Sequence, residues 1–146
     1  MKKLPKVSII IPTYNRKPLL SKCLESVLNQ TYRNIELIVV NDSSTDGTYE
    51  FLENLKSVYK GKGIKIIHNS RRRGLPYSRN VGLAVSSGEL VFFSEDDSLL
   101  SRDAIEKLVT IYLKYSKVVK VGGATPRVVL VSRDRSYSKV NYCNII

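Results

Sequence analysis

The chain has 146 residues, 42% of them hydrophobic and 25% charged, a composition typical of one globular domain with a buried core. Its apolar runs are far shorter than the about 18 residues that cross a bilayer, and its N-terminus MKKLPKVS lacks the apolar region of a signal peptide, so we expect a single domain over 1–146, in the cytoplasm or at the cytoplasmic face of a membrane. Lys and Arg outnumber Asp and Glu by 24 to 13, and the net charge of +11 favours phosphate-bearing partners such as nucleic acid, lipid headgroups or phosphorylated small molecules.

Short β-branched runs alternate along the chain with segments whose apolar residues recur every three or four positions, which is a βαβ pattern. Each run is almost continuously apolar, as is typical of a parallel sheet covered on both faces. The predicted strands are residues 7–11, 35–41, 64–68 and 90–93. Helices are predicted over 17–30, 47–59 and 76–86, and after a cap at Ser101; a fifth strand at 117–121 and an extended segment at 128–131 follow.

The first predicted helix has an apolar stripe that includes Leu19, Leu20 and Cys23. The second cysteine, Cys143, lies near the end of the chain. Neither cysteine has metal-ligand spacing with His68, so we expect two reduced, unreactive thiols.

Polar stretches follow each of the four predicted strands. In an open α/β sheet, ligands bind beyond the carboxyl ends of the strands. The stretches are PTYNR at 12–16, DSSTDGT at 42–48, NSRRRG at 69–74 and SEDD at 94–97. The sequence therefore predicts one sheet edge that combines an aromatic ring, guanidinium groups and carboxylates.

The acidic residues Glu95, Asp96 and Asp97 are the most informative of these groups. Adjacent carboxylates at the exit of a buried strand repel one another, so the cluster requires a compensating cation. A helix N-terminus could use the same negative charge, but these residues precede the predicted helix by several positions. The other stretches also have simpler interpretations: a helix start for 42–48, a solvated loop for 71–73 and a packing role for Tyr14.

Five stretches resemble the nucleotide-sugar-binding half of the family 2 glycosyltransferases, which have the GT-A fold. They are VSIIIPTYNR, CLESVLNQTYRNIELIVV, the spaced Asp42, Ser44, Asp46 and Thr48 of NDSSTDGT, GLPYSRNVGLAVSSGE, and the EDD that follows VFF. The resemblance runs from about Lys6 to Gly123. It implies a Rossmann-like, three-layer α/β/α sandwich with a mostly parallel central sheet.

The resemblance also implies a site for a nucleotide-diphosphate sugar, with a UDP-linked donor as our expectation. Tyr14 would stack on the base, and Pro12 and Thr13 would shape the loop around base and ribose. Asp42 would accept a hydrogen bond from a ring N–H of the base.

The same resemblance assigns roles to the acidic loop. Asp96 would hold the ribose hydroxyls, and Asp97 would coordinate a divalent cation, Mn²⁺ or Mg²⁺, that bridges the two phosphates. Arg79 would lie near the diphosphate or brace the acidic loop.

Two features depart from the family pattern. Ser94 stands where many relatives have the first acid of the metal loop. The general base that inversion requires has no candidate either, since Asp134 is the only acid after Glu106. By comparison with the family pattern, we expect the chain to lack much of the acceptor-binding half.

Two functions therefore compete. One is an inverting glycosyltransferase, or its donor-binding half, that acts on a glycan, lipid or protein acceptor. The other is a nucleotide-sugar-binding module that does not catalyse transfer or needs a partner chain. Nucleic acid is not expected as a partner, because aromatic and basic residues do not interleave as in a stacking platform. Apolar stretches near the C-terminus predict self-association.

Overall fold

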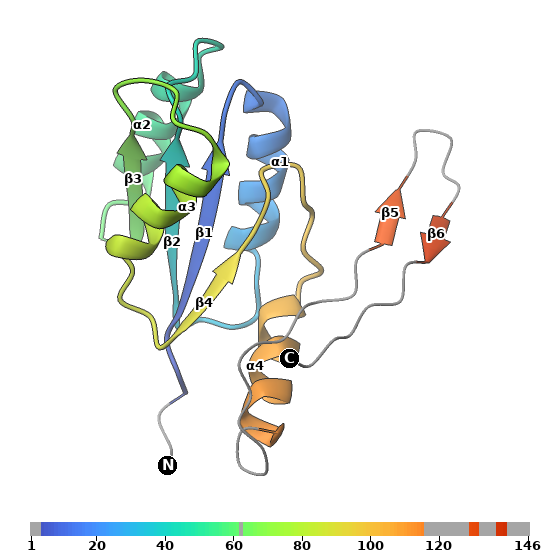
Figure 1. Cartoon of the computed structure of the whole chain (residues 1–146). Helices are drawn as coiled ribbons and strands as arrows, with labels where there is room; N and C mark the ends of the chain where they lie inside the picture. Colours follow the sequence, from blue (N-terminus) through green and yellow to red (C-terminus); the bar gives the residue numbers. More distant parts are fainter. Residues whose placement is uncertain (1–3, 62, 116–128, 132–136, 140–146) are drawn as a thin grey trace.

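The computed structural model describes residues 4–61 and 63–115, and beyond them the two short antiparallel strands β5 (Val129–Val131) and β6 (Tyr137–Lys139). Four strands form one parallel sheet in the order β3-β2-β1-β4 (Figure 1). Their bounds are Val7–Thr13 for β1, Ile35–Asn41 for β2, Ile64–His68 for β3 and Leu90–Phe93 for β4.

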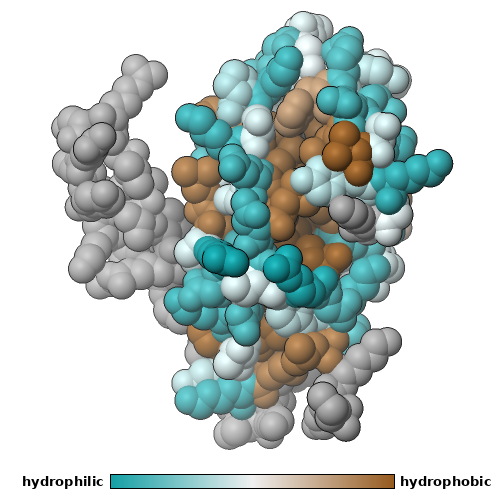
Figure 2. Space-filling model, turned by 180° about the vertical axis from the view of Figure 1, so that it is seen from behind, coloured by the Kyte–Doolittle hydropathy of each residue, from teal (hydrophilic) through white to brown (hydrophobic). Residues whose placement is uncertain are grey.

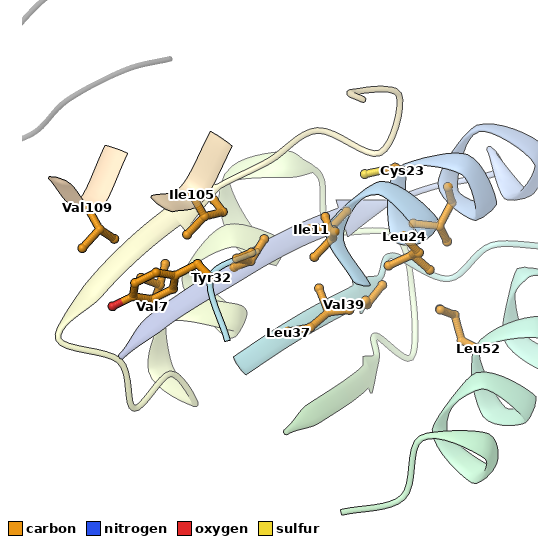
Figure 3. Packing of buried hydrophobic residues seen from close by; sticks show 13 residues of the cluster. Val7, Ile11, Cys23, Leu24, Tyr32, Leu37, Val39, Leu52, Ile105 and Val109 are labelled. Carbon is orange, nitrogen blue, oxygen red and sulfur yellow. The ribbon is translucent and has the colours of Figure 1, made fainter. Parts of the chain in front are cut away.

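Helices cover both faces of this sheet. They are α1 (Lys17–Leu28), α2 (Thr48–Val58), α3 (Leu75–Ala84) and α4 (Ala104–Tyr115). Buried residues of α1, α2 and α4 pack with one face of β1 and β2, as Figure 3 shows for Leu24, Leu52 and Ile105. Helix α3 packs against the other face. The predicted three-layer α/β/α architecture is therefore confirmed.

Helix α3 lies close to the sheet because Gly82 has no side chain. A Cβ atom at Gly82 would stand 2.5 Å from Cγ2 of Ile10 on β1, which is closer than real Cβ contacts. Pro76 lies in the first turn of α3, as the sequence predicts, because its missing N–H is not needed there.

Two burial predictions are wrong. Leu19 does not belong to the buried stripe of α1 and is 45% exposed. Figure 2 shows that hydrophobic patches lie among hydrophilic side chains on the face opposite to that of Figure 1. Strand β4 is not covered on both faces either, because α3 packs against β1 and β2 and leaves Val91 and Phe93 exposed in the described part of the chain.

The element bounds otherwise follow the predicted pattern. Strand β1 runs two residues further than predicted, through Pro12 and Thr13, since both pair with β2. The predicted strand at 117–121 and Cys143 lie outside the described residues. In the part of the chain that is described, each helix is too short or too polar to cross a membrane.

Cys23 lies in the core beneath the acidic loop (Figure 3). Its Sγ is 3.3 Å from the carbonyl oxygen of Glu95, to which it donates. Burial raises the pKa of the Cys23 thiol to about 11, so the group stays protonated near neutral pH. This agrees with the prediction of an unreactive thiol.

A buried carboxylate ties the start of β4 to the sheet. Glu36 on β2 is 1% exposed and lies beside Ser8 of β1 in the strand register. Burial alone would raise the pKa of Glu36, but hydrogen bonds from Ser8, Ser87 and Lys65 outweigh it and hold that pKa well below its usual range. Its donors are Ser8 Oγ, Ser87 N and Oγ, Gly88 N, Lys6 Nζ and Lys65 Nζ.

Replacing this carboxylate should destabilise the fold in a pH-dependent manner. We expect Glu36→Gln to lower the free energy of unfolding at pH 7 by about 2 kcal/mol, because charge-assisted hydrogen bonds are lost and buried donors stay unpaired. The depressed pKa means that the carboxylate stabilises the fold above the unfolded-state pKa of about 4.3 and loses this effect as the pH falls. Urea unfolding should therefore show a difference from wild type that narrows below about pH 5. Glu25→Gln, at an exposed position, is the control, and an equal effect of both substitutions would contradict the prediction.

Candidate functional site

A pocket opens at the carboxyl ends of β1, β2 and β4. Its walls come from the loops that follow these strands, from the loop after β3 and from the start of α3. The structure brings together five of the seven residues singled out in the sequence, and they line this pocket: Pro12, Thr13, Tyr14, Asp42 and Asp96. The other two, Arg79 and Asp97, join it through ion pairs with Glu95 and with Arg16, two further pocket residues.

The loop after β1 is held by the loop after β2. Asn15 adopts a positive φ of 51°, and its side-chain oxygen accepts a hydrogen bond of 2.7 Å from the Thr45 amide. Its own amide donates to Ser44 Oγ at 3.0 Å. These contacts fix the backbone after Tyr14, and the Thr13 carbonyl oxygen, which accepts a hydrogen bond from the Asp42 amide, fixes it before Tyr14, so the position of the aromatic ring is set by the fold.

The Tyr14 ring already carries a flat cation. The guanidinium carbon of Arg72 lies 4.2 Å from the ring centroid, a cation–π contact. Tyr14 is half-buried and lines the pocket. A ring held in this way is a platform on which a flat group can stack, whereas the packing role considered for Tyr14 gives no reason for its position in a pocket.

Asp42 organises the arginine-rich loop after β3. The carboxylate is 4% exposed and accepts hydrogen bonds from the Asn69 side chain at 2.7 Å and the Gly74 amide at 2.7 Å, besides the Arg73 amide. Burial works to raise the pKa of Asp42, but these donors outweigh it and lower the pKa. A charged carboxylate therefore lies in the pocket wall at neutral pH. Its predicted contact with a base stays a prediction.

The helix-start role considered for 42–48 belongs to Asp46. Its Oδ1 accepts hydrogen bonds from the amide and the hydroxyl of Thr48, at 3.2 and 2.6 Å, at the beginning of α2. Its Oδ2 accepts from the Lys17 amide at the beginning of α1. The segment thus serves both purposes, with Asp46 starting helices and Asp42 shaping the pocket.

The acidic loop is compensated by two arginines. Nη1 of Arg16 lies 3.2 Å from Oδ1 of Asp96 and 3.1 Å from Oδ2 of Asp97. Asp96 is 5% exposed and also accepts a hydrogen bond of 2.8 Å from the Thr13 hydroxyl. Helix α4 begins only at Ala104, so Asp96 and Asp97 do not serve its N-terminus.

Arg79 pairs with Glu95, which agrees with its bracing the acidic loop, the second of its two predicted roles. Its Nε is buried and has no hydrogen-bond partner among the described residues. A buried donor without a partner costs free energy.

The donor set of the acidic loop fits a hard divalent cation. A single positively charged nitrogen, Arg16 Nη1, touches one oxygen of each aspartate, so two carboxylate oxygens already converge on one cationic position. Carboxylate oxygens are the ligands that Mg²⁺ and Mn²⁺ prefer. No group of three or more His, Cys, Asp or Glu side chains suited to a metal occurs among the described residues, so a cation here would need ligands from a substrate or water as well.

Sequence reasoning missed the partners that arrange these groups. Arg16 could have been found from its place in the same loop as Tyr14, two residues further on. Arg72 was recognisable only as one of three consecutive arginines. Asn69, whose side chain binds Asp42, could be recognised only as part of the polar stretch 69–74. The Gly74 amide carries no sequence signal, since a backbone donor has no residue type.

Comparisons with known proteins point to one family. Residues 8–140 match the family model described as glycosyl transferase family 2. A protein of Haemophilus influenzae described as an uncharacterized glycosyltransferase is 34% identical over 119 residues, which are 82% of this chain and 47% of that protein.

Solved structures of glycosyltransferases share the fold. The mannosyltransferase PcManGT from Pyrobaculum calidifontis, in complex with GDP-Man and Mn²⁺, matches with a TM-score of 0.76 and 28% identity over 87% of this chain and 36% of its own. TarS 1–349 of S. aureus, in complex with UDP-GlcNAc, matches with a TM-score of 0.67 and 29% identity over 76% of this chain and 32% of its own. The chain spans less than half the length of each of these proteins.

Removing the charge of Asp42 should loosen the arginine-rich loop. In Asp42→Asn an amide group faces backbone donors, and we expect the free energy of unfolding to fall by about 1–3 kcal/mol. Limited digestion with trypsin should then cut after Arg71, Arg72 or Arg73 faster than in wild type. Asp103→Asn, which alters a half-exposed aspartate outside the pocket, is the control. Unchanged cleavage at the loop would show that Asp42 does not hold it.

Proposed function

Because the chain belongs to glycosyl transferase family 2, we propose that it binds a nucleotide-diphosphate sugar with a divalent cation and forms the donor half of an enzyme that transfers the sugar, with inversion, to an acceptor hydroxyl. The observation that carries this proposal is a pocket in which an aromatic platform, a buried carboxylate and an acidic loop meet. An aromatic platform suits a base, and an acidic loop with a cation suits a diphosphate.

The nucleoside would lie along the wall formed by Tyr14 and Asp42. Support comes from the ring of Tyr14, which already stacks on a flat guanidinium, and from the charged Asp42 carboxylate, which can accept a hydrogen bond from a ring N–H. Both uracil and guanine present such a group. We propose a UDP-linked donor; the structures similar to this chain include one with UDP-GlcNAc and one with GDP-Man.

The ribose and diphosphate would lie toward the acidic loop. Asp96 would hold the ribose hydroxyls, and Asp97 would be a ligand of Mn²⁺ or Mg²⁺. When bound, such a cation would neutralise negative charge on the leaving diphosphate. Support comes from the converging oxygens of Asp96 and Asp97.

The general base is not assigned. The pocket carboxylates among the described residues are Asp42, Glu95 and Asp96, and each already interacts with donors of the protein. A base must be free to take a proton from the acceptor hydroxyl. This favours a second candidate for the 146 residues alone: a nucleotide-sugar-binding module that transfers the sugar only together with further protein.

Donor binding should depend on metal through Asp97. We expect calorimetry to show UDP binding at least about tenfold tighter with Mn²⁺ than with EDTA, a difference of about 1.4 kcal/mol. Asp97→Asn should remove most of this difference and keep the metal-free affinity. Tyr14→Ala should weaken binding under both conditions, because stacking does not need the cation.

The same titration with GDP tests the choice of base. Equal UDP affinity with Mn²⁺ and with EDTA would remove the metal from the proposal. Tighter binding of GDP than of UDP would replace the proposed UDP-linked donor by a GDP-linked one and would leave the proposed binding pocket unchanged.

Turnover distinguishes the two candidates. We expect the 146-residue chain to bind UDP but to release it from UDP-sugars slowly or not at all, because each pocket carboxylate among the described residues already interacts with a donor of the protein. A coupled assay of UDP release, with and without candidate glycan, lipid or protein acceptors, measures this. Rapid release that depends on an acceptor would show that the chain carries its own base.

A further inference from the structure

We propose that Arg16 is an exchangeable counter-ion: it competes with a divalent cation for Asp96 and Asp97, and it releases them when a nucleotide diphosphate enters the pocket. This inference rests on the proposed function, since it assumes that the acidic loop binds a cation together with the nucleotide. The inference adds that the protein should bind the cation weakly without a nucleotide diphosphate and tightly with one.

The competition follows from the geometry of one atom. Nη1 of Arg16 donates to Oδ1 of Asp96 and to Oδ2 of Asp97, the oxygens that converge on one position. A divalent cation that used both oxygens would take the place of this nitrogen. It would also stand next to a guanidinium of the same sign, and like charges at such distances repel. Arg16 and the cation therefore exclude each other.

The loop needs one of the two cations. Glu95 is paired with Arg79. Among the described residues, the cationic partner of both Asp96 and Asp97 is Arg16. Two adjacent carboxylates without a cation would repel each other, and Asp96 is largely removed from water. Arg16 thus keeps the acidic loop in place before any ligand arrives.

Arg16 can release Asp96 and Asp97 without disturbing the fold. Its carbonyl oxygen accepts hydrogen bonds from the amides of Leu19 and Leu20, which fixes its backbone at the start of α1. Its side chain is 52% exposed, and so is nearly half of the Asp97 side chain at 48%. An ion pair this exposed is weak, so a competing cation and ligand can displace it while the backbone stays fixed.

The nucleotide gives the released side chain a new partner. Arg16 itself lines the pocket, so a diphosphate bound there would lie within the reach of its guanidinium. Arginine binds phosphate oxygens with two parallel hydrogen bonds, in the same way as it binds carboxylates. Exchange of Arg16 from the aspartates to the diphosphate would couple the binding of cation and nucleotide, and such coupling is reciprocal.

The test is a Mn²⁺ titration of the full chain, followed by electron paramagnetic resonance, without nucleotide. We expect Arg16→Gln to bind Mn²⁺ about two- to fivefold more tightly than wild type, as loss of a weak competing ion pair implies. Lys17→Gln is the matched control: it removes the same charge one residue further on, from an exposed side chain that makes no recorded contact with the aspartates. Addition of UDP should raise the Mn²⁺ affinity of wild type strongly and that of Arg16→Gln less.

A second variant guards against misfolding. Arg16→Lys keeps the charge and loses the guanidinium, so its Mn²⁺ affinity should lie between those of wild type and Arg16→Gln. Equal affinity of wild type and both Arg16 variants, or an equal rise in Lys17→Gln, would overturn the competition while leaving the proposed function intact. No Mn²⁺ binding by any variant, even with UDP, would overturn both.

Discussion

Parallel pairing of β1 with β2 on one side and with β4 on the other is the constraint on which the site depends. The pairing is in register from Val7 onward, so the ends of these three strands lie at one edge of the sheet. Tyr14, Asp42 and Asp96 are distant in sequence, yet each follows one of these strands closely. No loop needs to be long, because the sheet has already brought the side chains within reach.

This arrangement buries negative charge, and the protein compensates that charge in three different ways. Glu36 at the opposite end of the sheet is bound by lysines, serines and backbone amides. Asp42 is bound by an amide side chain and by backbone amides of a loop. Asp96 is bound by the Thr13 hydroxyl and a guanidinium. A buried carboxylate stays charged only if such donors replace water, which explains why these loops are fixed where they are.

Much of the fold and the place of the site could be predicted from the sequence, because both follow from periodicity. Apolar runs predict the strands, and the polar residue after each run marks the sheet edge. The partners of the site residues could not be predicted in this way. The donors to Asp42 include the Gly74 amide, which no residue type reveals, and the neighbour of Asp97 is Arg16, which a sequence pattern leaves as an ordinary charged residue before a helix. Leu19 was predicted to be buried because the spacing of apolar residues on a helix does not show how wide the covered face is. Strand β4 was predicted to be covered on both faces because a continuously apolar strand is typical of a sheet with helices on both sides.

The degree of exposure separates the ion pairs that hold the fold from those that can change partners. The Glu36 side chain is 1% exposed, and its donors come from β1, the loop before β4 and two lysines, so no single movement could release it. Asp97 is half-exposed and has one recorded partner, whose own side chain is equally exposed. Water and ions reach both side chains of the Asp97 pair but not the carboxylate of Glu36, and screening acts only where they reach. A binding site needs exposed ion pairs that can change partners where the ligand enters, and buried ion pairs that hold the surrounding fold. In this chain the sheet separates them, with Glu36 at one end fixing the start of β4, and the acidic loop at the other end free to exchange Arg16 for a ligand.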